Sequence, residues 1–407
     1  MNQVEKLIWE LCPEGVEYRP LLEVSTYVRG LTYAKHDEDE FGALSVLRAN
    51  NINTLNNRID FTGLKKIKAT VKVNPKQRLF AGDILMCAAS GSKSHVGKVA
   101  YFCDDQHESL AFGGFMSVIR TEKTFSSRFL FHILTSSVFL RFLESSLNST
   151  TINNISAGLL SNFQVPVPPL DVQQEIVRIL DTFTELEAEL EAELEARKKQ
   201  YEHYRNSLLS FPDHSVRWVP MGDVLDIVTA RTNRSDSGDR YVGVEDLAKG
   251  KQGLRQVGSF PSTDSGIGFE AGDILIGNIR PYLKKIWLAD FPGGTNGDVL
   301  TFRTKRDLEY GIDSQFMFQV LSSERFWQHA IATSKGTKMP RGDKASIMKF
   351  EFPLVDLQTQ TKIAQLLGRF EMLVNEQKSG LPAEISARRK QYEHYRSQLL
   401  TFKELVS

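Results

Sequence analysis

Five loops of this 407-residue chain gather side chains that form directed hydrogen bonds and carry positive charge. In the major groove of DNA, arginine suits guanine edges and asparagine suits adenine edges, whereas lysine and serine suit phosphates. The candidates in the first half are Arg48, Asn50, Asn51, Asn53, Ser90, Ser92, Lys93, His95 and Lys98. Those in the second half are Arg231, Thr232, Asn233, Arg234, Asn278, Arg280, Tyr282, Lys284, Lys285, Lys335, Lys338 and Arg341. The loops predict a DNA-binding surface, with ordinary solvated loops as the alternative for each one alone.

The sequence offers no catalytic or metal-binding constellation beside these loops. GSKSHVGKV at 91–99 resembles a phosphate-binding loop, but one residue too many separates its glycines, and Val99 replaces the hydroxyl that magnesium needs. FGGF at 112–115 is too short for a nucleotide or S-adenosylmethionine fingerprint, and the chain's Pro-Pro pair lacks the flanking amide and aromatic ring of amino-methyltransferases. Asp83, in a turn repeated at Asp273, is expected to be structural, and the histidines lack metal-ligand spacing.

The composition is that of a soluble globular protein, with 41% hydrophobic and 25% charged residues. The length suggests two or three domains. No apolar run is long enough for a membrane span, and three cysteines without paired spacing fit a reducing cytoplasm. The formal net charge is zero because residues 166–212 carry ten Asp and Glu against five Lys and Arg. The two flanking blocks are mildly basic, which permits DNA binding without proving it.

The chain repeats itself. RKKQYEHYRNSLLSF at 197–211 and RRKQYEHYRSQLLTF at 388–402 share eleven of fifteen residues. Further ordered matches join 16–24 to 216–224, 81–86 to 271–276, 129–134 to 316–321 and 165–183 to 352–370. The sequence therefore predicts two copies of one unit, each a mixed α/β block followed by a long helix.

Each predicted helix carries an apolar stripe with steps of three and four residues, which is typical of a coiled coil. The first helix is expected after Pro169 and before Pro212, and Gly380-Leu381-Pro382 should interrupt or kink the second. Three ELEA tetrapeptides at 185–196 predict either a solvated helical spacer or a ruler, in which each unit adds about 6 Å. In the blocks, 83–89 and 299–304 predict strands, and 127–146 predicts one amphipathic helix.

The chain has two variable blocks, and each is closed by a Pro-rich turn with Leu-x-x-Gln-x-x-Ile. A helix that ends in the repeated Gln-Tyr-x-x-Tyr-Arg motif follows each turn. This arrangement resembles the specificity subunit of type I restriction–modification systems. The tetrapeptides resemble the central-helix repeats of one subgroup, although the repeat unit here is ELEA, so that spacing rules based on other repeats need not transfer. The resemblance covers essentially the whole chain. It implies an α+β fold with two target-recognition domains at 1–165 and 213–352, and two helical segments at 166–212 and 353–407 that form an antiparallel coiled coil with an internal pseudo-twofold repeat.

The resemblance also implies a function and partners. Each recognition domain would read one half of a split site in double-stranded DNA, and the helices would receive two modification subunits, through which restriction subunits join. This chain would bind no cofactor: S-adenosylmethionine would belong to the modification subunits, which methylate adenine, and ATP and magnesium to the restriction subunits. The repeated motif would contact the modification subunits through Tyr201, Tyr204, Arg205, Tyr392, Tyr395 and Arg396. Plain packing of these tyrosines stays open as an alternative.

Two other function classes are weighed against this interpretation. A two-headed coiled-coil adaptor that binds proteins would also fit the near-neutral charge and the modest basicity of the loops. A self-sufficient methyltransferase is disfavoured by the missing Pro-Pro-aromatic motif.

Overall fold

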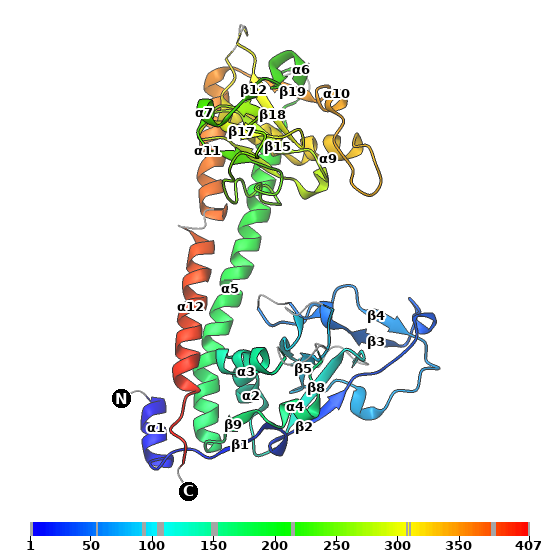
Figure 1. Ribbon diagram of the computed structural model, residues 1–407, viewed down its shortest axis with the longest axis vertical. Coiled ribbons are helices and arrows are strands. Elements are labelled where there is room, and N and C mark those ends of the chain that lie inside the picture. Colours follow the sequence, from blue (N-terminus) through cyan, green and yellow to red (C-terminus); the bar gives the residue numbers. More distant parts are fainter. Residues whose placement is uncertain are drawn as a thin grey trace. The chain divides into compact units, whose positions relative to one another are not determined.

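The computed structural model describes residues 3–53, 56–91, 95–103, 110–147, 154–212, 216–306, 308, 311–375 and 380–405. The chain forms two compact units, Met1–Ala188 together with Ala387–Ser407, and Glu189–Ser386 (Figure 1). These units differ from the predicted segments, because each helical segment contributes to both units.

The first unit combines sheets with short helices, as expected for an α+β block. Its main sheet has the strand order β2-β8-β5-β6, and a second sheet has the order β4-β3-β7, in which β3 and β7 run parallel. The strands are β1 Tyr18–Pro20, β2 Ser25–Arg29, β3 Leu44–Leu47, β4 Lys65–Ile67, β5 Ile84–Cys87, β6 Val99–Tyr101, β7 Leu110–Phe112, β8 Met116–Thr121 and β9 Gln164–Pro166. The helices are α1 Gln3–Leu11, α2 Ser127–Leu134, α3 Ser137–Leu147 and α4 Ala157–Leu160, with parts of α5 Leu170–Leu208 and α12 Leu381–Leu399.

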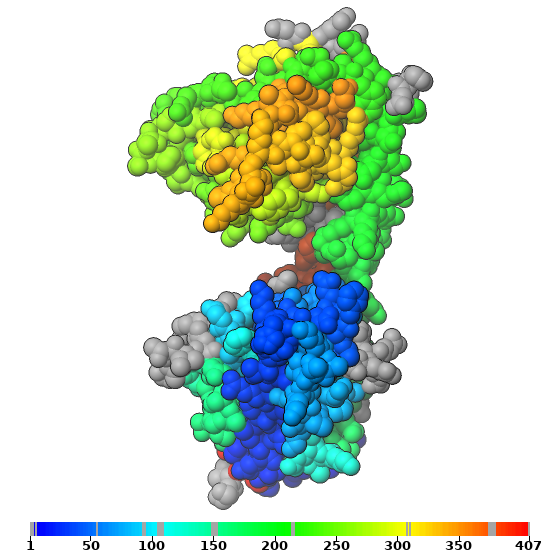
Figure 2. All heavy atoms as spheres, turned by 90° about the vertical axis from the view of Figure 1, so that its right-hand side faces the viewer, coloured from blue at the N-terminus to red at the C-terminus, as the bar shows by residue number. Residues whose placement is uncertain are grey.

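The second unit repeats this plan with the sheet orders β11-β18-β15-β16 and β12-β14-β17-β13. Its strands are β10 Arg217–Pro220, β11 Leu225–Ile227, β12 Arg231–Thr232, β13 Tyr241–Val242, β14 Gly266–Phe269, β15 Ile274–Gly277, β16 Ile286–Leu288, β17 Gly293–Thr295, β18 Val299–Thr304 and β19 Glu351–Leu354. Its helices are α6 Met221–Val224, α7 Arg234–Ser237, α8 Ser314–Leu321, α9 Glu324–Ala332, α10 Lys344–Ile347 and α11 Leu357–Asn375. In Figure 2 the orange segments around α10 cover much of the visible face of this unit.

Several local predictions are confirmed. The strand expected at 83–89 is β5, the strand expected at 299–304 is β18, and the first long helix is α5. The expected break in the second helix is also present at Gly380, whose φ of +83° is not helical, directly before α12 begins at Leu381. One prediction is wrong: 127–146 forms two helices, because the chain turns at Thr135 and Ser136, where the hydroxyl of Thr135 bonds the carbonyl of His132 and competes with the helix.

The repeated glutamine of the Leu-x-x-Gln motif ties each long helix to its block. The amide of Gln173 accepts a hydrogen bond from the backbone N–H of Ser126 at 2.8 Å and donates to the carbonyl of Pro168 at 2.8 Å. Gln360 does the same with the N–H of Asp313 and the carbonyl of Val355, both at 2.8 Å. Because both glutamines are buried, these bonds fix how α5 and α11 leave their blocks.

Each unit contains two antiparallel helix segments, one that begins there and one that ends there. In the first unit the ring of Phe183 on α5 stacks on Tyr395 of α12 with centroids 5.3 Å apart. In the second unit Tyr204, near the end of α5, stacks on Phe370 of α11, also at 5.3 Å. The predicted antiparallel pairing is thus present within each unit, and the QYxxYR motif at a helix end packs beside the start of the other helix.

Candidate nucleic-acid interface

The repeated Ala-Gly-Asp turn before β5 and β15 is structural. Asp83 is buried and receives two hydrogen bonds from Arg120, at 2.7 and 2.8 Å. Asp273 is held in the same way by Arg303, at 2.8 and 2.6 Å. Each carboxylate also caps the backbone three residues earlier, so neither is free for metal-dependent hydrolysis, as the sequence predicted. Within the described ranges, no three His, Cys, Asp or Glu side chains gather closely enough to hold a metal ion.

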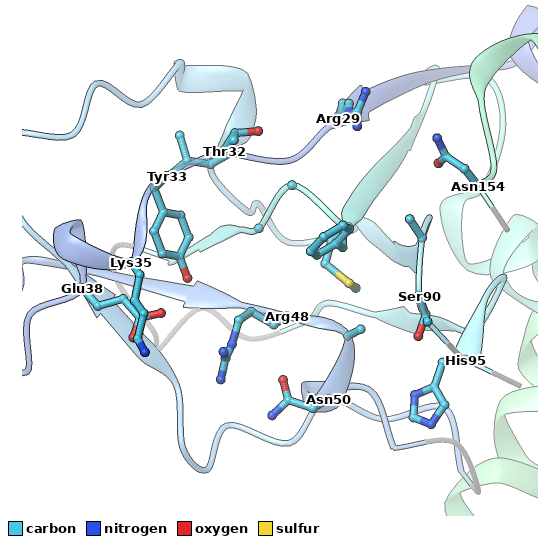
Figure 3. Close-up of a pocket in the computed structure, with 18 residues that line it drawn as sticks. Arg29, Thr32, Tyr33, Lys35, Glu38, Arg48, Asn50, Ser90, His95 and Asn154 are labelled. Atoms are coloured by element: carbon cyan, nitrogen blue, oxygen red, sulfur yellow. The ribbon is translucent and has the colours of Figure 1, made fainter. Parts of the chain in front are cut away.

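A cavity of about 1170 Å³ opens where strands β2, β3, β5 and β7 of the first unit end (Figure 3). It brings together two loops that the sequence singled out, one with Arg48 and Asn50 and the other with Ser90 and His95. Figure 3 shows these four side chains around one space, although Asn50 and Ser90 lie 40 positions apart in the sequence. The cavity therefore collects the hydrogen-bonding capacity that the loops predicted.

Arg48 is the predicted candidate in this cavity whose side chain has a donor left unpaired in the described part of the chain. Its backbone is fixed because its N–H donates to Oδ1 of Asn51 at 3.0 Å, and its side chain lies half-buried against the cavity wall. Among the described residues its Nε has no hydrogen-bond partner. A buried donor without a partner costs free energy that an incoming acceptor would recover, so this guanidinium is suited to a ligand with acceptor atoms.

The remaining candidates of the first unit divide into three groups. Asn51 was wrongly assigned to the interface, because it is buried and donates to the carbonyls of Asp60 and Thr62, which hold its own loop together. Asn53 is exposed and Lys98 is half-buried, and neither lines the cavity. Ser92 and Lys93 lie outside the described residues.

Sequence reasoning missed seven polar or aromatic residues that line the same cavity. They are Arg29, Thr32, Tyr33, Lys35, Glu38, Phe115 and Asn154. Arg29 is the last residue of β2, and the Gly113-Gly114 pair before Phe115 was a turn signal that could have indicated that loop. Arg29 and Lys35 add positive charge to the rim, with Glu38 as the acidic lining residue.

The second unit has a smaller cavity, of about 390 Å³, beside the turn that follows β17, the equivalent of β7. It is lined by Arg231 and Tyr241 together with the turn at Asn296 and Gly297. Beside this turn, Ile279 pairs with Arg341, and the N–H of Arg280 donates to the carbonyl of Pro340 at 2.7 Å. The candidate loops 277–285 and 334–344 are therefore in contact with each other.

Several candidates of the second unit are already engaged within the chain. Lys285 was wrongly assigned, because it is buried and donates to the carbonyl of Val244. Asn278 is buried too, although its Oδ1 has no partner among the described residues. Thr232 lies in β12, Asn233 caps α7, and Lys284 pairs with Glu324 at 2.6 Å. The exposed candidates are Arg231, Arg234, Arg280, Tyr282, Lys335, Lys338 and Arg341, of which Arg234, Lys335 and Arg341 form surface ion pairs.

The repeated QYxxYR motif is largely internal, which corrects its assignment as a partner-facing surface. Tyr201 and Arg205 are buried in the second unit, where the guanidinium of Arg205 lies 4.2 Å from the ring of Tyr201 and donates to Oε1 of Gln319. Arg396 is buried in the first unit and donates to Thr135 at 3.2 Å. Tyr392 is half-buried and bonds His132 at 3.0 Å. Packing against the block thus accounts for much of the repeat, and partner contact stays a prediction for Tyr204 and Tyr395, each 38% exposed.

The two copies of the motif meet different side chains. In the first unit His132 bridges Tyr392 and Asp181, whose carboxylate also binds Arg128 at 2.8 and 3.1 Å. At the position of His132, the second unit has Gln319, which contacts Tyr201 and Glu371. Burial raises the pKa of Glu371 and of Tyr201, and no histidine stands at this position in the second unit.

His132 is expected to make the first unit acid-sensitive. Burial lowers its pKa below the usual range, as do Arg128 and Arg396, while the bond to Asp181 opposes this shift. Below about pH 6.5, His132 of the unfolded chain therefore binds a proton that the buried imidazole of the folded chain does not bind. The free energy of unfolding falls as pH drops, by up to about 1.4 kcal/mol per pH unit. His132→Gln, the residue of the second unit, should flatten this dependence between pH 6.5 and 5, measured by hydrogen exchange of α2.

His36→Gln is the matched control, because the side chain of His36 is 82% exposed in the same unit. An unchanged slope in the His132 variant would contradict the assignment. Asp181 acts in a separate window: its pKa is lowered even though burial opposes this, so its contribution is lost only as pH falls through a value below 3.8.

The sequence profile of the type I restriction modification DNA specificity domain matches this chain twice, at residues 13–196 and 216–387. The chain belongs to this family of type I specificity proteins. It is 36% identical over 177 residues to the type I restriction enzyme EcoKI specificity subunit of Escherichia coli (strain K12), a match that covers 42% of this chain and 36% of that subunit. It is 27% identical over 368 residues to a putative type I restriction enzyme specificity subunit of Haemophilus influenzae, which covers 83% of this chain and 91% of the relative.

Solved structures of the family share the fold. The S subunit from M. genitalium aligns over 95% of this chain and 96% of its own, with a TM-score of 0.51 and 14% identity. A chain from a study of complex assembly and conformational transition of the type I R-M system aligns over 95% and 94%, with a TM-score of 0.52 and 15% identity. The specificity family, its two domains and its α+β fold are therefore confirmed, while membership of a tetrapeptide-repeat subgroup stays a prediction. None of the helices in the described part of the chain combines the length and hydropathy that a membrane crossing needs.

Proposed function

We propose that this chain is the DNA-reading subunit of a type I restriction–modification complex, in which each unit reads one half of a bipartite site. One observation carries the proposal: both units place Arg and Asn side chains around a cavity beside the turn that follows an equivalent strand, β7 in the first unit and β17 in the second. A duplicated surface in one chain suits a site with two separated halves.

The cavity of the first unit has the chemistry for direct readout. Arg48 and Asn50 can bond base edges, and Arg29 and Lys35 can neutralise phosphates at the rim. Affinity should fall with salt, because phosphate contacts release counterions. The chain itself would perform no chemistry: two modification subunits with S-adenosylmethionine would methylate adenine, and restriction subunits with ATP and magnesium would join through them. Of the six residues of the repeated motif that were predicted to contact these subunits, Tyr204 and Tyr395 are the exposed ones and would dock them.

The deciding experiment maps adenine methylation across the genome of cells that express this chain with its cognate modification subunit. We expect a new split motif, with methylated adenines in both halves. The control strain carries Arg48→Ala with Asn50→Ala, which should weaken recognition of one half only. An assembled complex that creates no new motif would contradict DNA reading and favour the protein-binding adaptor.

A further inference from the structure

We infer that Phe115 reads a thymine in the half-site of the first unit, and that the equivalent turn of the second unit carries a polar reader instead. This inference rests on the proposed function and names a base that the site should contain. It concerns the turn Gly113–Met116, which lines the cavity of the first unit between β7 and β8.

Backbone hydrogen bonds fix this turn at Gly113, Phe115 and Met116. The N–H of Met116 donates to the carbonyl of Gly113 at 2.7 Å and closes the turn. The carbonyl of Phe115 accepts from Ala88 at 2.9 Å and from Ala89 at 3.0 Å, which binds the turn to the end of β5. The fold thus holds Phe115 rigidly, yet its side chain is 71% exposed.

Close backbone packing supports the turn from the other side. The N–H of Gly30 donates to the carbonyl of Met116 at 2.9 Å, and a Cβ at Gly30 would come within 2.1 Å of the carbonyl oxygen of Gly113. A residue other than glycine at position 30 would therefore displace the turn. Because the turn is already ordered, binding of a ligand that contacts Phe115 costs less conformational entropy.

The ring of Phe115 shares its cavity with charged and polar side chains. Arg29, Lys35, Arg48 and His95 line the same cavity, and Cγ of Arg48 would contact a Cβ added at Gly113. An apolar partner would remove the exposed ring from water, which is favourable. In the major groove the apolar group that bases present is the 5-methyl of thymine, and phenylalanine is among the side chains that contact it. Because Arg48 and Asn50 suit purine edges in that groove, Phe115 beside them suits thymine.

The second unit keeps the backbone of this turn and changes its side chain. The N–H of Val299 donates to the carbonyl of Asn296 at 3.1 Å, and the carbonyl of Asp298 accepts from Asn278 at 2.8 Å. Asp298 thus takes the place of Phe115, and its carboxylate pairs with Arg341 at 3.2 Å. One turn with two different side chains is what a variable reading position requires, since carboxylate and guanidinium address cytosine and guanine edges and not the thymine methyl.

The test uses the complete chain with its modification subunit and synthetic duplexes. Selection from a random duplex pool yields the bound site, and each thymine in it is then replaced singly by deoxyuridine, which lacks the methyl group. We expect one thymine whose replacement weakens binding about fourfold, as for one methyl group returned to water. Phe115→Ala should weaken binding of the thymine duplex roughly tenfold and abolish the effect of uracil, whereas Phe115→Leu should retain part of it.

Phe41→Ala is the matched control, since Phe41 is 93% exposed in the same unit but does not line the cavity. It should leave both affinities unchanged. The inference is overturned if the selected site has no thymine, if uracil is tolerated at every position, or if the uracil effect persists in Phe115→Ala. If no bipartite duplex is selected at all, the proposed function fails instead.

Discussion

Replacing Arg205 with alanine is expected to lower the free energy of unfolding of the second unit by about 3–5 kcal/mol. Arg205 is 1% exposed and bonds Gln319, Glu202 and the carbonyl of Ser322 while covering the ring of Tyr201. Its removal takes a donor from the carbonyl of Ser322 and from Oε1 of Gln319, which keeps its bond from Tyr201. Burial raises the pKa of Glu371 and the charge of Arg205 lowers it, so the removal raises that pKa further. Urea unfolding followed by tryptophan fluorescence measures the effect, since Trp218, Trp287 and Trp327 all lie in this unit.

Arg197→Ala on the same helix is the control. Its side chain is 51% exposed and pairs with Glu193 at 3.3 Å, so its loss should cost about 0.5 kcal/mol or less. Equal costs at the two positions would mean that Arg205 does not anchor the helix to the block.

Deleting the tetrapeptide 189–192 is expected to weaken binding of the original DNA site at least about 100-fold and to shift recognition to a different gap. The deletion shortens α5 by about 6 Å and turns the two ends relative to each other by about 40°. Since α5 runs through both units without a break, a half-site at the old distance loses several base contacts, each worth about 1–3 kcal/mol. Methylation mapping should return the same two half-sites with an altered gap.

Glu189→Gln keeps the helix length and should leave the gap unchanged, which separates length from charge. Insertion of a fourth ELEA should change the gap in the opposite direction from the deletion. A constant gap across all three variants would show that the tetrapeptides are only a solvated spacer.

Those parts of the fold that depend on local pattern could be predicted from the sequence. The apolar stripe that includes Ile176 and Leu180 predicted α5, and short apolar runs predicted β5 and β18. These predictions succeed because the periodicity of a helix or a strand depends only on residues that are close in the sequence. The break between α2 and α3 could not be predicted in this way. It depends on Thr135, which also receives the buried Arg396 from the far end of the chain.

The site was predicted loop by loop, and the structure separates the loops that meet from those that do not. Arg48, Asn50, Ser90 and His95 converge because β3 and β5 end at one edge of the block. Asn51 and Lys285 belong to the residue types that bind DNA elsewhere, but each donates a hydrogen bond to a backbone carbonyl of its own unit. The sequence alone does not show which carbonyl a side chain will meet. Phe115 was not predicted to line the site, because an aromatic residue next to a strand is usually buried in the core.

The origin of each unit in the chain bears on how the protein is made. The first unit needs residues from Ala387 onward, which the ribosome adds about 200 residues after Ala188, so the first part of this unit must wait for them. At ordinary elongation rates that interval is roughly 10–40 s. During it, the side chains of His132 and Phe183, which pack against Tyr392 and Tyr395 of α12 in the folded chain, stay exposed. The half synthesised first is therefore finished second. A messenger cut short anywhere before residue 387 yields a product with an open core, which a cellular protease can distinguish from the complete chain.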